Sequence, residues 1–182
     1  ELNEFKFALI IGNEDYSSFQ TGLETEVDVD FAISDAEAFK EYAMKYLGVP
    51  EENIVLKTNA RALDMLKAIK KMNLYAKNTF GQGEFIFYYA GHGLPHEKTK
   101  EPYLMPVDVG GSDIEFAIKL KDIYDKLTEH PTKRVTVFLD ACFSGGGRNQ
   151  GLVAARGVKI KAKEEMVESN LVVFTSSSGN QS

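Results

Sequence analysis

Short, almost continuous apolar runs alternate along this chain with segments in which apolar residues recur at helical spacing. The runs that predict buried strands cover residues 5–11, 53–57, 85–90, 135–139 and 171–175. Helical spacing predicts helices over 36–47, over about 58–80 and over 121–129. Strands that are apolar on both sides and separated by helices are typical of α/β folds. We therefore expect a mostly parallel central sheet with helices on both faces, an αβα sandwich.

Local signals predict where two of these helices begin. The segment Ser34-Asp35-Ala36-Glu37 matches a capping box, in which Ser34 would cap the helix that Gly48 ends. Thr58 is expected to cap the next helix.

Length and composition limit the class of protein. Residues 1–182 suit one domain, and 43% hydrophobic with 26% charged residues is ordinary for a soluble protein. The net charge of -6 disfavours nucleic acid as a partner, and no apolar run reaches the roughly 18 residues of a membrane span. The single cysteine cannot form an internal disulfide, so we expect a cytoplasmic protein.

Two of the predicted strands each end in a reactive side chain. Cys142 follows the apolar run 135–139, and His92, fifty positions upstream, follows the run 85–90. Glycines accompany both, so the backbone can turn sharply there. Because the carboxyl ends of parallel strands meet at one edge of a sheet, this pattern predicts a cysteine-histidine nucleophilic site.

The chemistry of acyl transfer suits this pair. A free thiol with a pKa of about 8.5 is mostly protonated at neutral pH, and the His92 imidazole can take its proton and later protonate the leaving amine. The backbone amides of Gly93 and Cys142 are the expected oxyanion hole. Each residue alone has an ordinary structural interpretation, since cysteine and histidine are often buried in cores. Their joint position at two strand ends favours catalysis.

The motifs around both residues resemble those of a known family. Tyr89-Ala90-Gly91-His92-Gly93 and Asp140-Ala141-Cys142-Phe143-Ser144-Gly145 are similar to the histidine and cysteine signatures of caspase-like cysteine peptidases, more closely those of metacaspases and their bacterial relatives. The resemblance runs from the first strand to Ser182. It implies a caspase-hemoglobinase fold, with Cys142 as nucleophile and His92 as general acid and base.

Two acidic residues predict the substrate class. Asp140 stands where animal caspases have glutamine, as in metacaspases, and Asp35 matches a second acidic position of that group. Two carboxylates in a specificity pocket would favour a cation, so we expect cleavage of peptides or proteins after Arg or Lys. The alternatives are that Asp35 only stabilises a helix N-terminus and that Asp140 only orients its loop.

A basic segment follows the cysteine. The resemblance implies that residues of about 145–168 link a large-subunit portion to the start of a small-subunit portion, whose remainder we expect beyond Ser182. Self-cleavage of a zymogen is expected in this linker, although a solvated loop is the alternative. The candidate processing sites are Arg148, Arg156, Lys159, Lys161 and Lys163.

No cofactor or metal is expected from the sequence. His92 and His96 are separated by Gly93 and Pro95, which prevent the helix that would join them on one metal. Calcium activation occurs among metacaspases, but the acids between Glu24 and Asp30 lack EF-hand spacing and are interpreted as solvated. The alternative function is a catalytically idle, caspase-like interaction or scaffold domain.

Overall fold

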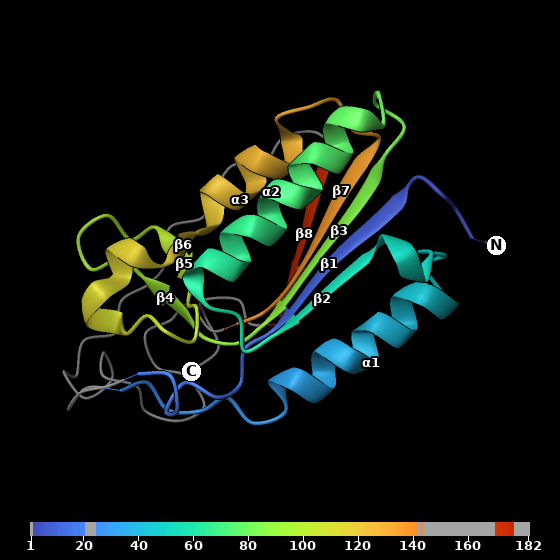
Figure 1. Ribbon diagram of the computed structural model, residues 1–182. Coiled ribbons are helices and arrows are strands. Elements are labelled where there is room, and N and C mark those ends of the chain that lie inside the picture. Colours follow the sequence, from blue (N-terminus) through green and yellow to red (C-terminus); the bar gives the residue numbers. More distant parts are fainter. Residues whose placement is uncertain (1, 21–24, 142, 144–169, 177–182) are drawn as a thin grey trace.

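A five-stranded parallel sheet forms the centre of this computed structural model, which describes residues 2–20, 25–141, 143 and 170–176 (Figure 1). The strand order is β2-β1-β3-β7-β8, and every neighbouring pair is parallel. The strands are β1 (Lys6–Gly12), β2 (Ile54–Thr58), β3 (Glu84–Ala90), β7 (Arg134–Asp140) and β8 (Leu171–Thr175). All five were predicted, with ends that differ by at most one residue. The inner strands β1 and β3 are largely buried on both faces, which is what nearly unbroken apolar runs predict, whereas the edge strands β2 and β8 are partly exposed.

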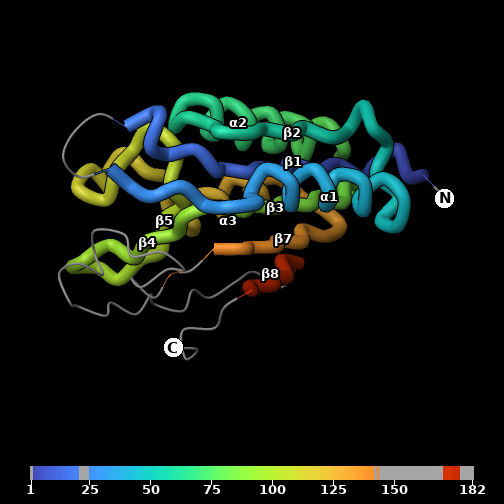
Figure 2. The backbone as a smooth tube through the Cα atoms, turned by 90° about the horizontal axis from the view of Figure 1, so that it is seen from below, coloured from blue at the N-terminus to red at the C-terminus, as the bar shows by residue number. Residues whose placement is uncertain are grey.

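Helices cover both faces of this sheet, which confirms the predicted α/β class. Helix α1 (Ala32–Lys45) packs on one face, and α2 (Ala62–Asn78) and α3 (Leu120–Thr128) pack on the other. Figure 2 shows α1 lying over β1 and β3 and running along them, with β7 and β8 to one side of it.

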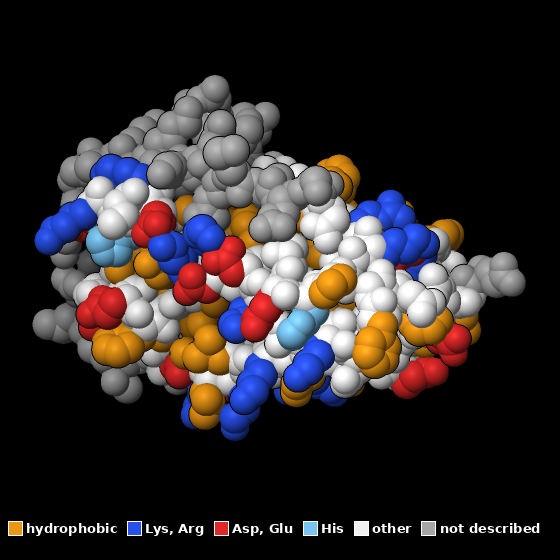
Figure 3. All heavy atoms as spheres, turned by 90° about the horizontal axis from the view of Figure 1, so that it is seen from above, with side chains coloured by type: hydrophobic (Ala, Val, Ile, Leu, Met, Phe, Trp, Pro, Cys, Tyr) orange, Lys and Arg blue, Asp and Glu red, His pale blue; other side chains and the backbone are white. Residues whose placement is uncertain are grey.

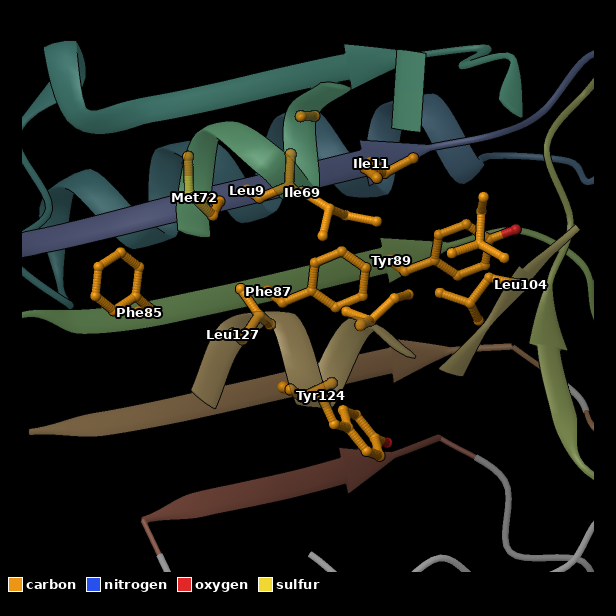
Figure 4. Close-up of a cluster of buried hydrophobic side chains, with 14 of the residues drawn as sticks. Leu9, Ile11, Ile69, Met72, Phe85, Phe87, Tyr89, Leu104, Tyr124 and Leu127 are labelled. Carbon is orange, nitrogen blue, oxygen red and sulfur yellow. The ribbon is translucent and has the colours of Figure 1, made fainter. Parts of the chain in front are cut away.

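Alternating side chains of the strands supply the two halves of the core. On β1, Leu9 and Ile11 join the larger cluster under α2 and α3, whereas Ala8 and Ile10 face α1. Figure 4 shows the larger cluster, with Tyr89 at its end and the tyrosine hydroxyl directed away from the aliphatic side chains.

A small antiparallel sheet lies beside the carboxyl ends of the central strands and was not predicted. It consists of β4 (Gly93–Pro95), β5 (Pro102–Leu104) and β6 (Ile118–Lys119), followed directly by α3. Two 3-10 turns complete the described elements, η1 (Glu51–Asn53) and η2 (Gly111–Phe116). Strands of two or three residues are too short to carry a readable alternation, which is why the pattern missed them.

Both predicted helix caps were wrong. Helix α1 begins earlier, after Phe31, and the Ser34 hydroxyl donates a hydrogen bond of 2.9 Å to the Phe31 carbonyl instead of capping. Thr58 ends β2, and α2 begins at Ala62, whose N–H donates to the Asp108 carboxylate at 2.9 Å. A cap supplied from a distant segment has no local signature.

The surface carries charges of both signs. On the face seen in Figure 3, basic and acidic side chains are interspersed and neither forms a continuous field. Exposed ion pairs on α3 and next to it, such as Lys121–Asp125 and Lys126–Glu129, contribute to this mixture. Within the part of the chain that the structure describes, no helix is both long enough and apolar enough to cross a bilayer.

Candidate active site

The carboxyl ends of β3 and β7 lie side by side at one edge of the central sheet. Ala90 is the register partner of Asp140, and the Gly91 N–H donates to the Asp140 carbonyl at 3.3 Å. Along the chain, His92 and Cys142 each come two residues after this pair. His92 is described and half-buried, whereas Cys142 lies outside the described residues.

Phe143, the residue after Cys142, lies against the residue after His92. A Cβ atom built on Gly93 would be only 2.5 Å from Cε1 of the Phe143 ring, so the ring occupies the space that a side chain at position 93 would need. Phe143 also packs on the larger core cluster. The two predicted signature segments are therefore in contact at Gly93 and Phe143.

The His92 ring is held by a carbonyl group. Its Nε2 atom lies 2.7 Å from the carbonyl oxygen of Val27. Because a carbonyl can only accept, Nε2 carries the proton in this hydrogen bond. In the neutral imidazole Nδ1 is then left unprotonated, which is the state that a general base requires.

Asp28, the residue after Val27, holds its loop against residues 16 and 17 by hydrogen bonds. Its Oδ1 accepts the N–H groups of Ser17 and Tyr16, both at 2.9 Å, and its Oδ2 accepts the Ser17 hydroxyl at 3.1 Å. The hydrogen bond from the Ser17 N–H is the main reason that the pKa of Asp28 lies below its usual range, and the nearby His92 also lowers it.

The expectation that all the acids of this loop are solvated was wrong for Glu26. That side chain is 2% exposed, and its carboxylate accepts the Gly111 N–H at 3.1 Å. Sequence reasoning also missed Val27, because its contribution is a backbone carbonyl that any residue could supply.

Besides burial, the charges of Asp140 and Asp35 both raise the pKa of the Tyr88 hydroxyl. Asp35 is exposed in the first turn of α1, and Asp140 is the half-buried last residue of β7. Burial raises the pKa of Tyr88 to about 12, and the charges of Asp140 and then Asp35 add to this effect. The Tyr88 ring stacks on Phe39 of α1, with centroids 4.2 Å apart. Both carboxylates therefore lie near the α1-side face of β3.

Part of the predicted site falls in segments that the structure does not describe. The amide of Cys142, the linker of about 145–168 and all five candidate processing sites lie outside the described residues.

His96 has a structural role in a turn. Its Nδ1 accepts the N–H groups of Lys98 and Thr99, at 3.2 and 3.3 Å. Within the described ranges, no three histidine, cysteine, aspartate or glutamate side chains are grouped so as to hold a metal ion.

Comparisons with known proteins agree with this architecture. The profile of the peptidase C14 family, described as the caspase domain, matches residues 5–182. The crystal structure of protein GSU0716 from Geobacter sulfurreducens has a similar fold, with a TM-score of 0.56 and 21% sequence identity. The match covers 84% of this chain and 53% of that protein, so this chain spans about half of its length. No curated protein matches the sequence.

Proposed function

The chain belongs to the caspase domain family of cysteine peptidases, and on that premise we propose that it is an endopeptidase that cleaves after Arg or Lys. Cys142 is the proposed nucleophile and His92 the proposed general base and acid. The observation that carries the proposal is the contact between Phe143 and Gly93. Phe143 follows Cys142 directly and Gly93 follows His92 directly, so this contact supports the proposal that the two residues act at one site.

The state of the His92 ring supports a defined sequence of proton transfers. Nδ1 takes the thiol proton, and the Cys142 sulfur attacks the carbonyl carbon of the peptide bond. The amides of Gly93 and Cys142 would stabilise the resulting oxyanion. The same Nδ1–H then protonates the leaving amine as the C–N bond breaks, giving an acyl-enzyme. Water, deprotonated by His92, attacks the thioester, and the thiol is released as the acid product leaves.

Peptide turnover tests this function. Wild type, Cys142→Ala and His92→Ala are compared on peptides that differ only in arginine, lysine or aspartate before the scissile bond, with and without calcium. We expect hydrolysis after arginine and lysine by wild type alone. Hydrolysis that persists in Cys142→Ala overturns the nucleophile, and faster cleavage after aspartate overturns the basic specificity.

Asp35 and Asp140 are the proposed acidic groups of the specificity pocket. Asp35 is exposed, so solvent screens its interaction with a substrate cation to about 1 kcal/mol, or about fivefold in kcat/KM. Asp35→Asn is compared with Glu37→Gln, which removes another exposed carboxylate from α1. If Asp35 only stabilises the helix N-terminus, Asp35→Asn will lower stability, and neither variant will change kcat/KM for the arginyl peptide.

We also propose self-cleavage within the linker after Cys142. The five basic residues from Arg148 to Lys163 match the proposed specificity. Mass spectrometry of the full-length protein should detect a cut after one of them in wild type and none in Cys142→Ala. An uncut wild type that hydrolyses arginyl peptides contradicts this processing while leaving the peptidase intact.

A further inference from the structure

Two buried phenols bracket the backbone of His92. Tyr16 and Tyr89 are both 0% exposed, and their hydroxyl oxygens are 3.3 Å apart. The Tyr16 oxygen accepts the His92 N–H at 3.0 Å, and the Tyr89 hydroxyl donates to the His92 carbonyl at 2.8 Å. The Tyr16 ring also packs against the His92 imidazole, with centroids 4.7 Å apart.

Both hydroxyls also lie close to the carbonyl of Met105, the residue that follows β5. The Tyr16 hydroxyl lies 3.1 Å from the Met105 carbonyl and Tyr89 lies 3.0 Å from it. The Met105 N–H in turn donates to the His92 carbonyl at 3.0 Å. With one proton on each hydroxyl, Tyr89 can donate to His92 and Tyr16 to Met105 while Tyr16 accepts from His92. The arrangement fixes both polar groups of the His92 backbone.

Gly91 has no side chain, and the two tyrosine hydroxyls occupy the space that a side chain there would need. It has φ +152, and a Cβ atom there would be 2.7 Å from the Tyr89 oxygen and 2.9 Å from the Tyr16 oxygen. Any larger residue would push the hydroxyls away from His92 and would also be strained by this backbone conformation. The glycine before the histidine is thus explained by the tyrosine pair.

Burial keeps both hydroxyls neutral. It raises the pKa of Tyr16 and of Tyr89 above that of an ordinary phenol. Each hydroxyl therefore remains both a donor and an acceptor over the pH range in which a peptidase would be assayed.

We propose that Tyr16 and Tyr89 are positioning residues that hold His92 in its reactive orientation through its backbone and its ring. This inference rests on the proposed role of His92 in catalysis. Phenylalanine would fill the same volume in a core, so the hydroxyls matter because of the hydrogen bonds and not because of packing alone.

The test uses Tyr16→Phe, Tyr89→Phe and the double variant. We expect kcat for the arginyl peptide to fall about tenfold in Tyr16→Phe while KM stays within about twofold, because a misplaced catalytic group affects the chemical step. A second readout is the pH dependence of Cys142 alkylation by iodoacetamide, which reports thiolate formation without substrate. Its profile should move from that of wild type toward that of His92→Ala.

Tyr75→Phe is the matched control. The ring of this half-buried tyrosine of α2 packs on Phe7, near the start of β1, with ring centroids 4.9 Å apart. It lies away from the carboxyl ends of the strands, so Tyr75→Phe should leave both readouts unchanged. If Tyr16→Phe does not fold in a urea titration, Tyr89→Phe carries the test, because the Met105 N–H still donates to the His92 carbonyl.

The outcomes separate this inference from the proposed function. If wild type and His92→Ala have the same alkylation profile, His92 does not activate Cys142 and the proposed function fails. If those two profiles differ but the tyrosine variants keep the wild-type profile and kcat, the positioning role is overturned. A loss of stability alone, with kcat unchanged, overturns it as well.

Discussion

Replacing Gly93 with alanine should displace Phe143 and so disturb the segment that carries the proposed nucleophile. The new Cβ would be 2.5 Å from Cε1 and 2.8 Å from Cδ1 of the Phe143 ring. Carbon atoms pack best at about 3.5 Å or more, so the ring must move by about 1 Å. Overpacking of this size typically costs about 1–3 kcal/mol of stability.

A loss of activity should remain after the rate is corrected for the loss of stability. A displacement of about 1 Å in a catalytic group can reduce the rate about 100-fold, which corresponds to roughly 2.7 kcal/mol of transition-state energy. The assay measures kcat/KM for an arginyl peptide, normalised to the folded fraction from urea unfolding. Phe143→Leu should make room for the added methyl group, so Gly93→Ala/Phe143→Leu should recover activity relative to Gly93→Ala.

Two results would refute this reasoning. Wild-type kcat/KM in Gly93→Ala would mean that the contact between these residues does not control the site. A double variant no more active than Gly93→Ala would mean that the loss has another cause, such as damage to the amide proposed for the oxyanion hole.

Three further predictions concern other parts of the molecule. Asn13→Ala removes a buried amide that accepts the Ala60 N–H at 2.7 Å and donates to the Ala60 and Met105 carbonyls at 3.2 and 3.1 Å. The Met105 carbonyl keeps the Tyr16 hydroxyl, but the Ala60 N–H loses its partner, so the free energy of unfolding measured in urea should fall by about 2–3 kcal/mol, whereas the same substitution of an exposed asparagine should leave it unchanged. Burial raises the pKa of Glu84, but the ion pairs, first that with Lys133, outweigh this and lower it. Its stabilisation is present above the usual carboxyl pKa of about 4.3 and is lost as the pH falls through the lowered value, so the stability difference between wild type and Glu84→Gln should shrink in acid; a constant difference contradicts the ion pair. Asp140→Asn should lower kcat/KM for arginyl peptides about tenfold, and equal rates in both proteins would exclude Asp140 from the specificity pocket.

The central sheet was predictable because its inner strands β1 and β3 are largely buried on both faces and because the other three strands also carry short apolar runs. A strand that is covered on both faces requires a nearly unbroken apolar run, so 85–90 was found nearly to the residue. The run 135–139 located β7 equally well, although its residues alternate between buried and half-buried. The register of β3 on β7 then follows the expectation that their ends meet, although Cys142 itself lies outside the described residues.

What escaped prediction depends on contacts between distant segments. The carboxylate that caps α2 belongs to Asp108, and the group that orients the His92 ring is the Val27 carbonyl. Neither has a local pattern, because a cap from afar and a backbone oxygen leave no preferred residue beside the element they serve. Tyr16 and Tyr89 are readable as core aromatics, and their hydrogen bonds to His92 appear only in three dimensions.

The most direct measurement is to trap the covalent intermediate. The full-length protein is treated with a thiol-reactive peptide ketone ending in arginine, and the modified residue is located by mass spectrometry. We expect one adduct per chain, on Cys142, with formation slowed strongly in His92→Ala and an aspartyl analogue reacting poorly. An unmodified Cys142, or labelling that is equally fast without His92, would contradict the proposed cysteine-histidine pair.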